Sequence, residues 1–179
     1  MRILGVDPGT LITGYGVIDE KGKNCNLVDF GVISTGSTMS MPLRLRIIYK
    51  ELIDVIEKST PDEFAIESAF YSKNVQSTLK LGYTRGVSIL AAALREIPTS
   101  EYSPREVKQS VVGHGNASKE QVAYMVRKLL KLEQSTDIPL DATDALAVAL
   151  CHASKRMRPR AQVKSWKQFV EEKPERVKS

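Results

Sequence analysis

Cysteine is scarce in this chain of 179 residues, which has only Cys25 and Cys151. The two residues stand far apart and lack the paired spacing of a zinc site. Isolated cysteines of this kind are more often small buried hydrophobic residues than partners in a disulfide. We therefore exclude a disulfide framework and a thiolate metal site, and we assign neither residue a role.

Long hydrophobic runs are also missing. No stretch of about 18 consecutive apolar residues occurs, and the residues after Arg2 lack the apolar core and the small-residue cleavage site of a signal peptide. We therefore expect a soluble, cytoplasmic protein with no membrane contact. The length of the chain and its 42% hydrophobic content predict one globular domain with a sizeable core.

The net charge of +5 is unevenly distributed along the chain. From Lys155 onward, nine Lys and Arg residues stand against three Glu, whereas residues 1–154 carry a net charge of −1. Within that body, residues 73–128 carry a net charge of +5. A basic stretch within a part of the chain that is otherwise close to neutral predicts a surface that binds a polyanion.

The end of the chain differs in composition from the rest. Beyond Met157 it has two prolines, many charges and few aliphatic residues. We therefore predict a folded domain over residues 1–155 and a flexible basic tail over residues 156–179. Trp166 and Phe169 could dock this tail locally, and its charge would add a nonspecific, salt-sensitive affinity for a polyanion.

Hydrophobic periodicity predicts strands early in the chain and an alternation of strands and helices later. The predicted strands cover residues 3–6, about 15–18, 24–34, 64–66 and 99–102, and the predicted helices cover residues 41–56, 73–97, 104–112, 118–132 and 141–155. Ser103 and Glu106 form a capping box at the start of one helix. An antiparallel hairpin followed by this alternation is typical of an α/β domain with a mixed sheet.

Two acids end predicted core strands. Asp7 follows the apolar run that ends at Val6, and Glu67 follows the run that ends at Ile66. A desolvated carboxylate without a partner costs several kcal/mol, so an acid at such a point favours a bound cation or a donor-rich turn. For Asp7 the alternative is simple turn chemistry, because Asp-Pro-Gly is a common turn sequence.

The last predicted helix carries Asp141 and Asp144, three residues apart and therefore on one face. Acids in the first turn interact favourably with the helix dipole, which is the plain structural explanation of the pair. However, residues 145–150 are all apolar, so this helix should be buried against the sheet. Acids that served only a surface would not need such a position.

Four carboxylates are thus candidates for one site: Asp7, Glu67, Asp141 and Asp144. If the two strands are parallel neighbours, their ends open at the same edge of the sheet, where ligand sites usually lie. Converging carboxylates raise one another's pKa unless divalent cations neutralise them, and oxygen ligands favour Mg²⁺ or Mn²⁺ over zinc. Two such ions about 4 Å apart can hydrolyse phosphodiesters.

Five segments of the chain resemble, in order, those of the RuvC family of Holliday junction endonucleases. They read GVDPGTLITGYGVI, PDEFAIESAFYSKN, LKLGYTRGV, VKQSVVGHG and DATDALAVAL, and the resemblance spans residues 1 to about 155. It implies a ribonuclease-H-like α/β fold with a central mixed five-stranded sheet flanked by helices. It also implies a homodimer that nicks two opposing strands of a four-way junction in recombination and DNA repair, with RuvA and RuvB as branch-migration partners.

By motif position, the resemblance makes Asp7, Glu67, Asp141 and Asp144 the catalytic, metal-binding acids. It implies Mg²⁺ as the cofactor, with Mn²⁺ as a substitute and two ions in each site. It also gives Phe70 a role in stacking on an unpaired base at the junction. A core aromatic is the alternative explanation for Phe70, and Tyr71 and Tyr83 are weaker candidates for the same stacking role.

Several basic residues also acquire roles from the resemblance. Lys108 and Lys119 match residues near the scissile phosphate, where cations stabilise developing negative charge. Lys73, Lys80 and Arg85 would contact the DNA backbone and position the junction without reading its sequence. The alternative for each lysine is a solvated helix face. His114 lies in a glycine-rich loop, and we assign it no role.

Three other functions remain open at this point. The GVDPGT turn also fits an ATP-binding domain of the actin and Hsp70 type, whose backbone amides wrap phosphates, although that nucleotide sits between two such domains. A non-catalytic dimeric module that binds branched DNA would leave Glu67 and the buried acid pair without a purpose. A nuclease for another structured nucleic acid is disfavoured only by the resemblance.

Overall fold

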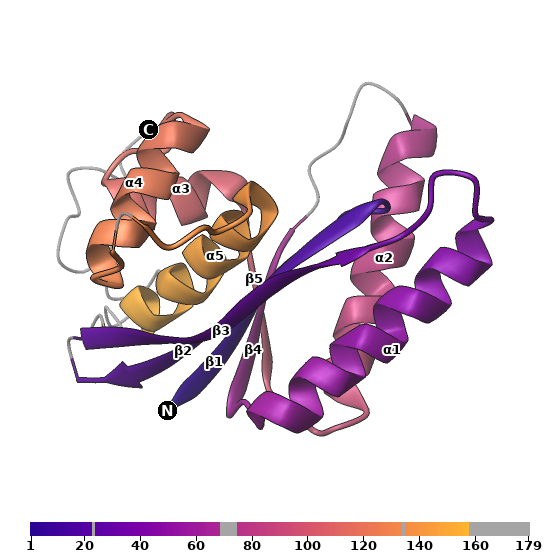
Figure 1. Cartoon of the computed structure of the whole chain (residues 1–179), viewed down its shortest axis with the longest axis horizontal. Coiled ribbons are helices and arrows are strands. Elements are labelled where there is room, and N and C mark those ends of the chain that lie inside the picture. Colours follow the sequence, from indigo (N-terminus) through magenta and orange to yellow (C-terminus); the bar gives the residue numbers. More distant parts are fainter. Residues whose placement is uncertain (23, 69–74, 134, 158–179) are drawn as a thin grey trace, which may run out of the picture.

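The sheet has five strands in the order β3-β2-β1-β4-β5, so the first strand of the chain lies at its centre (Figure 1). The structure is a computed structural model that describes residues 1–22, 24–68, 75–133 and 135–157. The strands are β1 (Arg2–Asp7), β2 (Ile12–Lys21), β3 (Asn24–Ser34), β4 (Glu63–Glu67) and β5 (Thr99–Tyr102). The first three strands form an antiparallel meander, and β1, β4 and β5 are parallel, which confirms the mixed sheet.

Helices cover both faces of this sheet (Figure 1). They are α1 (Met41–Ser59), α2 (Val75–Ala93), α3 (Pro104–Val112), α4 (Lys119–Leu129) and α5 (Leu140–Met157). Ile3 belongs to the core beneath α3, α4 and α5, whereas Leu4 belongs to the core beneath α1 and α2. Successive side chains of a strand point to opposite faces, so β1 is apolar on both sides because both sides are covered.

The register of β1 and β4 brings two acids to the same edge of the sheet. Val6 pairs with Ile66 in parallel, and Asp7 and Glu67 are the next residues and the last of their strands. The expectation that these strands are parallel neighbours is therefore confirmed.

Helix α5 packs unusually close to the sheet because glycines face it. A Cβ atom on Gly5 would lie 2.3 Å from the carbonyl oxygen of Ala145, and one on Gly14 would lie 1.9 Å from that of Asp141. Small residues on the helix, including Ala142 and Ala149, are fully buried in this contact layer. The first turn of α5 is thus held directly against the end of the β1–β2 hairpin.

Most of the element boundaries expected from the sequence agree with the structure. The third strand spans Asn24–Ser34 as expected, and the capping box of Ser103 and Glu106 starts α3. The prediction that the second helix continues to Ile97 was wrong, because α2 ends at Ala93 and Glu96 has a φ of 56°. The Ile97 amide donates to the Ala92 carbonyl oxygen over 3.1 Å, which closes the end of the helix around the left-handed Glu96. Pro98 in turn disfavours a helical conformation at Ile97.

The described part of the chain contains no helix that is both long and apolar enough to cross a membrane. The folded domain predicted over residues 1–155 falls almost wholly within the described residues. From residue 158 on, the predicted tail lies outside them, together with Trp166 and Phe169.

The close approach of α5 makes Gly14 a sensitive position. Gly14→Ala should lower the free energy of unfolding by roughly 3 kcal/mol, because the new methyl group meets the backbone of Asp141 rather than a flexible side chain. Urea unfolding followed by circular dichroism measures this change. Gly36→Ala is the control, since its Cβ would meet only the Met39 side chain, at 3.3 Å. Equal stability of the two variants would contradict the packing described here.

Candidate functional site

A pocket of about 220 Å³ opens at the edge of the sheet where β1 and β4 end. Asp7 comes from β1, Glu67 from β4 and Asp144 from α5, and Lys108 from α3 and Lys119 from α4 complete its charged lining. The remaining wall is apolar and consists of Pro104, Val107, Val122 and Ala147. Five elements that are distant in sequence therefore supply three carboxylates and two amines to one pocket.

Asp7 and Glu67 line this pocket together, close enough for each carboxyl group to shift the pKa of the other. Burial, reinforced by the charges of Asp144 and Asp141, raises the pKa of Asp7 to about 6. Burial, together with the charge of Asp7, raises the pKa of Glu67 to about 8. The two carboxyl groups therefore hold a proton between them near neutral pH, because the pocket disfavours two adjacent negative charges.

Asp144 is held by an ion pair with Lys119. The Lys119 Nζ atom donates a hydrogen bond to Asp144 Oδ2 over 3.2 Å, and Asp144 raises the pKa of the amine. Lys119 is the first residue of α4, and its position is fixed by the capping box of Ser118 and Gln121. The start of α4 thus directs an amine toward a carboxylate on α5.

Asp141 lies one turn before Asp144 on α5 and does not line the pocket. It is half-buried, and its charge contributes to the raised pKa of Asp7. The structure therefore brings three of the four predicted acids together around the pocket and places the fourth within electrostatic reach of them.

The donor set of this pocket fits a hard divalent cation. Among the residues that the structure describes, no group of three or more His, Cys, Asp or Glu side chains is arranged to hold a metal ion. Instead, the raised pKa of Glu67 beside Asp7 favours a protonated carboxyl group, and Asp144 is paired with Lys119. The proton and the amine partly neutralise a cluster of carboxylates, which is the same electrostatic role that Mg²⁺ or Mn²⁺ fills among oxygen ligands.

Comparison with known proteins assigns the chain to a family. The family model described as "Crossover junction endodeoxyribonuclease RuvC" matches residues 3–152. A protein of that name from Cytophaga hutchinsonii is 46% identical over 177 residues, which cover 99% of this chain and 88% of that protein. One from Dehalococcoides mccartyi is 50% identical over 156 residues, which cover 87% of this chain and 93% of that protein. The chain belongs to the RuvC family.

A solved structure agrees with this assignment. Thermus thermophilus RuvC in complex with Holliday junction substrate matches with a TM-score of 0.82 and 34% identity, covering 88% of this chain and 95% of that chain. The ribonuclease-H-like α/β fold expected from the sequence is therefore confirmed. Members of the RuvC family are metal-dependent nucleases, which agrees with the carboxylate-rich pocket.

The basic and aromatic residues for which the RuvC resemblance implies roles lie partly in the pocket and partly on α2. Lys108 is half-buried and lines the pocket with Lys119, whereas Lys80 and Tyr83 are exposed on α2. Arg85 forms an ion pair with Glu101 on β5. The remaining candidates, Phe70, Tyr71 and Lys73, lie outside the described residues.

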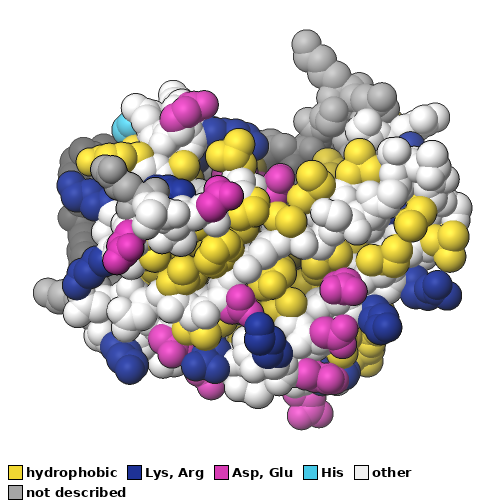
Figure 2. Space-filling view, in the orientation of Figure 1, with side chains coloured by type: hydrophobic (Ala, Val, Ile, Leu, Met, Phe, Trp, Pro, Cys, Tyr) yellow, Lys and Arg dark blue, Asp and Glu magenta, His cyan; other side chains and the backbone are white. Residues whose placement is uncertain are grey.

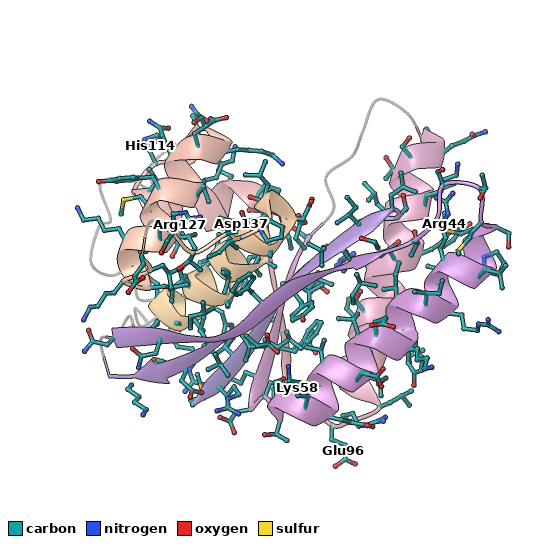
Figure 3. The ribbon with its side chains drawn as sticks, viewed as in Figure 1. Arg44, Lys58, Glu96, His114, Arg127 and Asp137 are labelled. Atoms are coloured by element: carbon teal, nitrogen blue, oxygen red, sulfur yellow. The ribbon has the colours of Figure 1, made fainter. Side chains whose placement is uncertain are left out.

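His114, which has no role assigned from the sequence, is exposed on the loop after α3. Figure 3 shows it at the outer rim of the layer formed by α3 and α4. This position gives no reason to assign it a role.

Sequence reasoning missed the buried residue His152 on α5. Its Nδ1 atom lies 2.7 Å from the Tyr102 hydroxyl of β5, and its Nε2 atom is hydrogen-bonded to Glu63 of β4, which also pairs with Arg156. Burial lowers the pKa of His152, so a neutral ring donates to the carboxylate and accepts from the hydroxyl. These bonds tie α5 to both strands, and a histidine in an otherwise apolar helix is the signal that could have revealed them.

The shared proton at Glu67 makes the stability of the metal-free protein depend on pH. Because the pKa of Glu67 is about 8 in the fold and ordinarily 4.5, the folded state binds the proton more tightly than the unfolded state. The free energy of unfolding therefore falls as the pH rises from about 4 to about 8. Glu67→Gln should remove this loss of stability. Near pH 8 its free energy of unfolding should exceed that of the wild type by about 2 kcal/mol.

Urea unfolding at several pH values, with a chelator present, measures this difference. The two proteins should be equally stable near pH 4, where Glu67 is protonated in both states of the wild type. Glu51→Gln, an exposed change on α1, should follow the wild type throughout. A Glu67→Gln protein that is less stable at every pH would contradict the shared-proton description.

Proposed function

We propose that this chain is a structure-specific endonuclease that resolves four-way (Holliday) junctions by nicking two opposing strands symmetrically. Its membership in the RuvC family makes it a crossover junction endodeoxyribonuclease. The observation that carries the proposal is the pocket in which Asp7, Glu67 and Asp144 meet Lys108 and Lys119. Phosphodiester hydrolysis by metal ions needs carboxylates that bind the ions and cationic groups that stabilise the negative charge on the phosphate, and this pocket contains both.

The metal ligands in this proposal are Asp7, Glu67, Asp141 and Asp144, with Mg²⁺ as the natural ion, Mn²⁺ as a substitute and two ions in each site. When bound, the ions supply an activated water and stabilise the leaving oxygen. For the carboxylates to bind them, Glu67 must release its proton, which favours cleavage at neutral to alkaline pH. Lys119 must also leave Asp144, and its amine then becomes available to the scissile phosphate together with Lys108.

The proposed homodimer has a physical reason in the substrate and a candidate surface on the protein. A four-way junction presents two equivalent phosphates related by a two-fold axis, and a symmetric dimer presents two sites in the same way. Helix α2 and the residue that follows it expose large hydrophobic side chains: Val75 (70% exposed), Leu79 (53%), Tyr83 (52%) and Leu90 (50%) on the helix, and Leu94 (57%) directly after it. Further hydrophobic side chains, including those of Met39 and Leu43, are exposed near the start of α1 (Figure 2). Water-exposed apolar surface of this extent favours burial against a second copy.

The DNA contacts outside the pocket are also part of the proposal. Phe70 follows Glu67 by three residues and would stack on an unpaired base at the junction centre. Lys73, Lys80 and Arg85 would contact phosphates and fix the position of the junction without reading sequence. Family membership supports RuvA and RuvB as partners, and a DNA substrate in bacterial relatives supports a cytoplasmic location.

Two of the three alternative functions are not supported by the site or by the family assignment. A non-catalytic DNA-binding module gives no reason to bury Asp7 and Glu67 so deeply that both carry raised pKa values. An ATP-binding domain of the actin and Hsp70 type is not supported because the RuvC family model accounts for residues 3–152.

Asp7→Asn tests the proposed chemistry. The substitution removes a metal ligand without touching the basic surface, so cleavage of a synthetic junction should fall by roughly 10³-fold while junction affinity stays within about two-fold. Asp54→Asn, the same change on the exposed face of α1, should cleave like the wild type. Gel assays of binding and cleavage measure both quantities. Loss of binding together with cleavage would contradict the assigned role of Asp7.

Phe70→Ala tests the proposed stacking. If the ring holds an opened junction centre, cleavage should fall by roughly ten-fold or more while binding changes little, because stacking on one base contributes about 1–3 kcal/mol. Binding and cleavage are measured on the same junction, and Tyr124→Ala, a change of an exposed aromatic residue on α4, is the control. Equal losses of binding and cleavage in Phe70→Ala would instead indicate an aromatic residue that supports the fold.

A further inference from the structure

A second cavity lies between the helices α3, α4 and α5, away from the carboxylates. It has a volume of about 180 Å³ and is lined by Cys25, Ser110, Val111, Leu129, Leu150, Ala153 and Ser154. Five of these side chains are apolar or thiol groups. A cavity of about 150 Å³ lined by aliphatic residues binds benzene, so this cavity, called here the α3–α5 cavity, is large enough for an aromatic ring.

The polar chemistry of the α3–α5 cavity is incomplete. Ser110 Oγ is buried and has no hydrogen-bond partner among the described residues. An unpaired buried hydroxyl costs about 1–3 kcal/mol, so such groups usually have a partner. Leu129, which is 42% exposed, lines the same cavity. The occupant that fits these walls is a flat apolar group with one hydrogen-bonding atom, such as the indole of tryptophan, which is apolar apart from its N–H donor.

The chain itself carries such a group close by. Leu150, Ala153 and Ser154 belong to α5, and the described structure ends at Met157, three residues beyond Ser154. The 22 residues that follow contain Trp166, the only tryptophan of the chain, with Phe169 and Val170 near it. Trp166 lies nine positions beyond Met157, and an extended chain of that length spans up to about 30 Å.

At least one relative aligns over the segment that holds Trp166. The Cytophaga hutchinsonii relative aligns with 99% of this chain and therefore with most of residues 158–179. The Dehalococcoides mccartyi relative aligns with only 87% of the chain. The alignment with the Cytophaga hutchinsonii relative thus extends over this segment, which is expected if the segment has a fixed position on the domain.

We propose that Trp166 docks its indole ring in the α3–α5 cavity, with its N–H donating to Ser110 Oγ. The docked segment lies against α3 and α4, the helices that carry Lys108 and Lys119. Nine Lys and Arg residues against three Glu from Lys155 onward would then add positive charge to the layer beside the carboxylate pocket.

The fluorescence of the single tryptophan tests this proposal in the full-length protein. In the wild type, Trp166 should emit at short wavelength and resist quenching by acrylamide. In Leu129→Glu, a charge in the cavity should shift the emission to longer wavelength and raise the quenching constant by roughly two-fold or more. Val28→Glu is the matched control, because Val28 is 41% exposed on β3 and is not among the residues that line the cavity. A fully exposed Trp166 in the wild type would overturn the proposal.

Alkylation of Cys25 gives an independent measurement that changes no cavity residue. Cys25 lines the cavity and is free, so Trp166→Ala should raise its alkylation rate by roughly ten-fold, as followed by the mass of its peptide. Phe169→Ala, a nearby aromatic change, should have a smaller effect. An unchanged rate in Trp166→Ala would overturn the proposal. A rate or emission that depends on protein concentration would also overturn it, in favour of docking on a second copy.

Discussion

The repulsion among carboxylates at the shared end of β1 and β4 is the constraint on which the rest of the site depends. Asp7 and Glu67 end neighbouring parallel strands, and α5 adds Asp141 and Asp144 to the same region. Burial keeps water from screening these charges, so the pocket holds a proton between two of the acids and an amine against a third. A cluster of carboxylates that is neutralised by a proton and an amine is well suited to bind divalent cations in their place.

The scaffold keeps these groups together through close packing and buried hydrogen bonds. The glycines of β1 and β2 let α5 lie directly on the sheet, and His152 bonds α5 to β4 and β5 through Glu63 and Tyr102. Capping boxes begin both α3 and α4, the helices that supply Lys108 and Lys119. The acids therefore lie on rigid elements, and each amine lies within two turns of a capped helix start. This limits the movement of both the carboxylates and the amines.

Much of this arrangement could be predicted from the sequence because the signals were local. The apolar runs that stop at Asp7 and Glu67 predicted both strands, and the apolar stretch after Asp144 predicted a buried helix. What could not be predicted depends on contacts between distant segments. The ion pair of Lys119 with Asp144, the pairing of Arg85 with Glu101 and the bonds of His152 all join residues that no periodicity connects. The end of α2 was missed because the left-handed conformation of Glu96, followed by Pro98 five residues beyond Ala93, stops the helix although the apolar spacing continues.

The most direct test of the account is a cleavage assay with a synthetic four-way junction and a linear duplex of the same sequence, each with Mg²⁺ or with a chelator at a fixed salt concentration. The account predicts nicks at symmetry-related positions on two opposing strands, found only with the junction and only with the metal. Binding of the junction without cleavage, in Mg²⁺ and in Mn²⁺ and over several junction sequences, would contradict it, as would equal cleavage of the duplex.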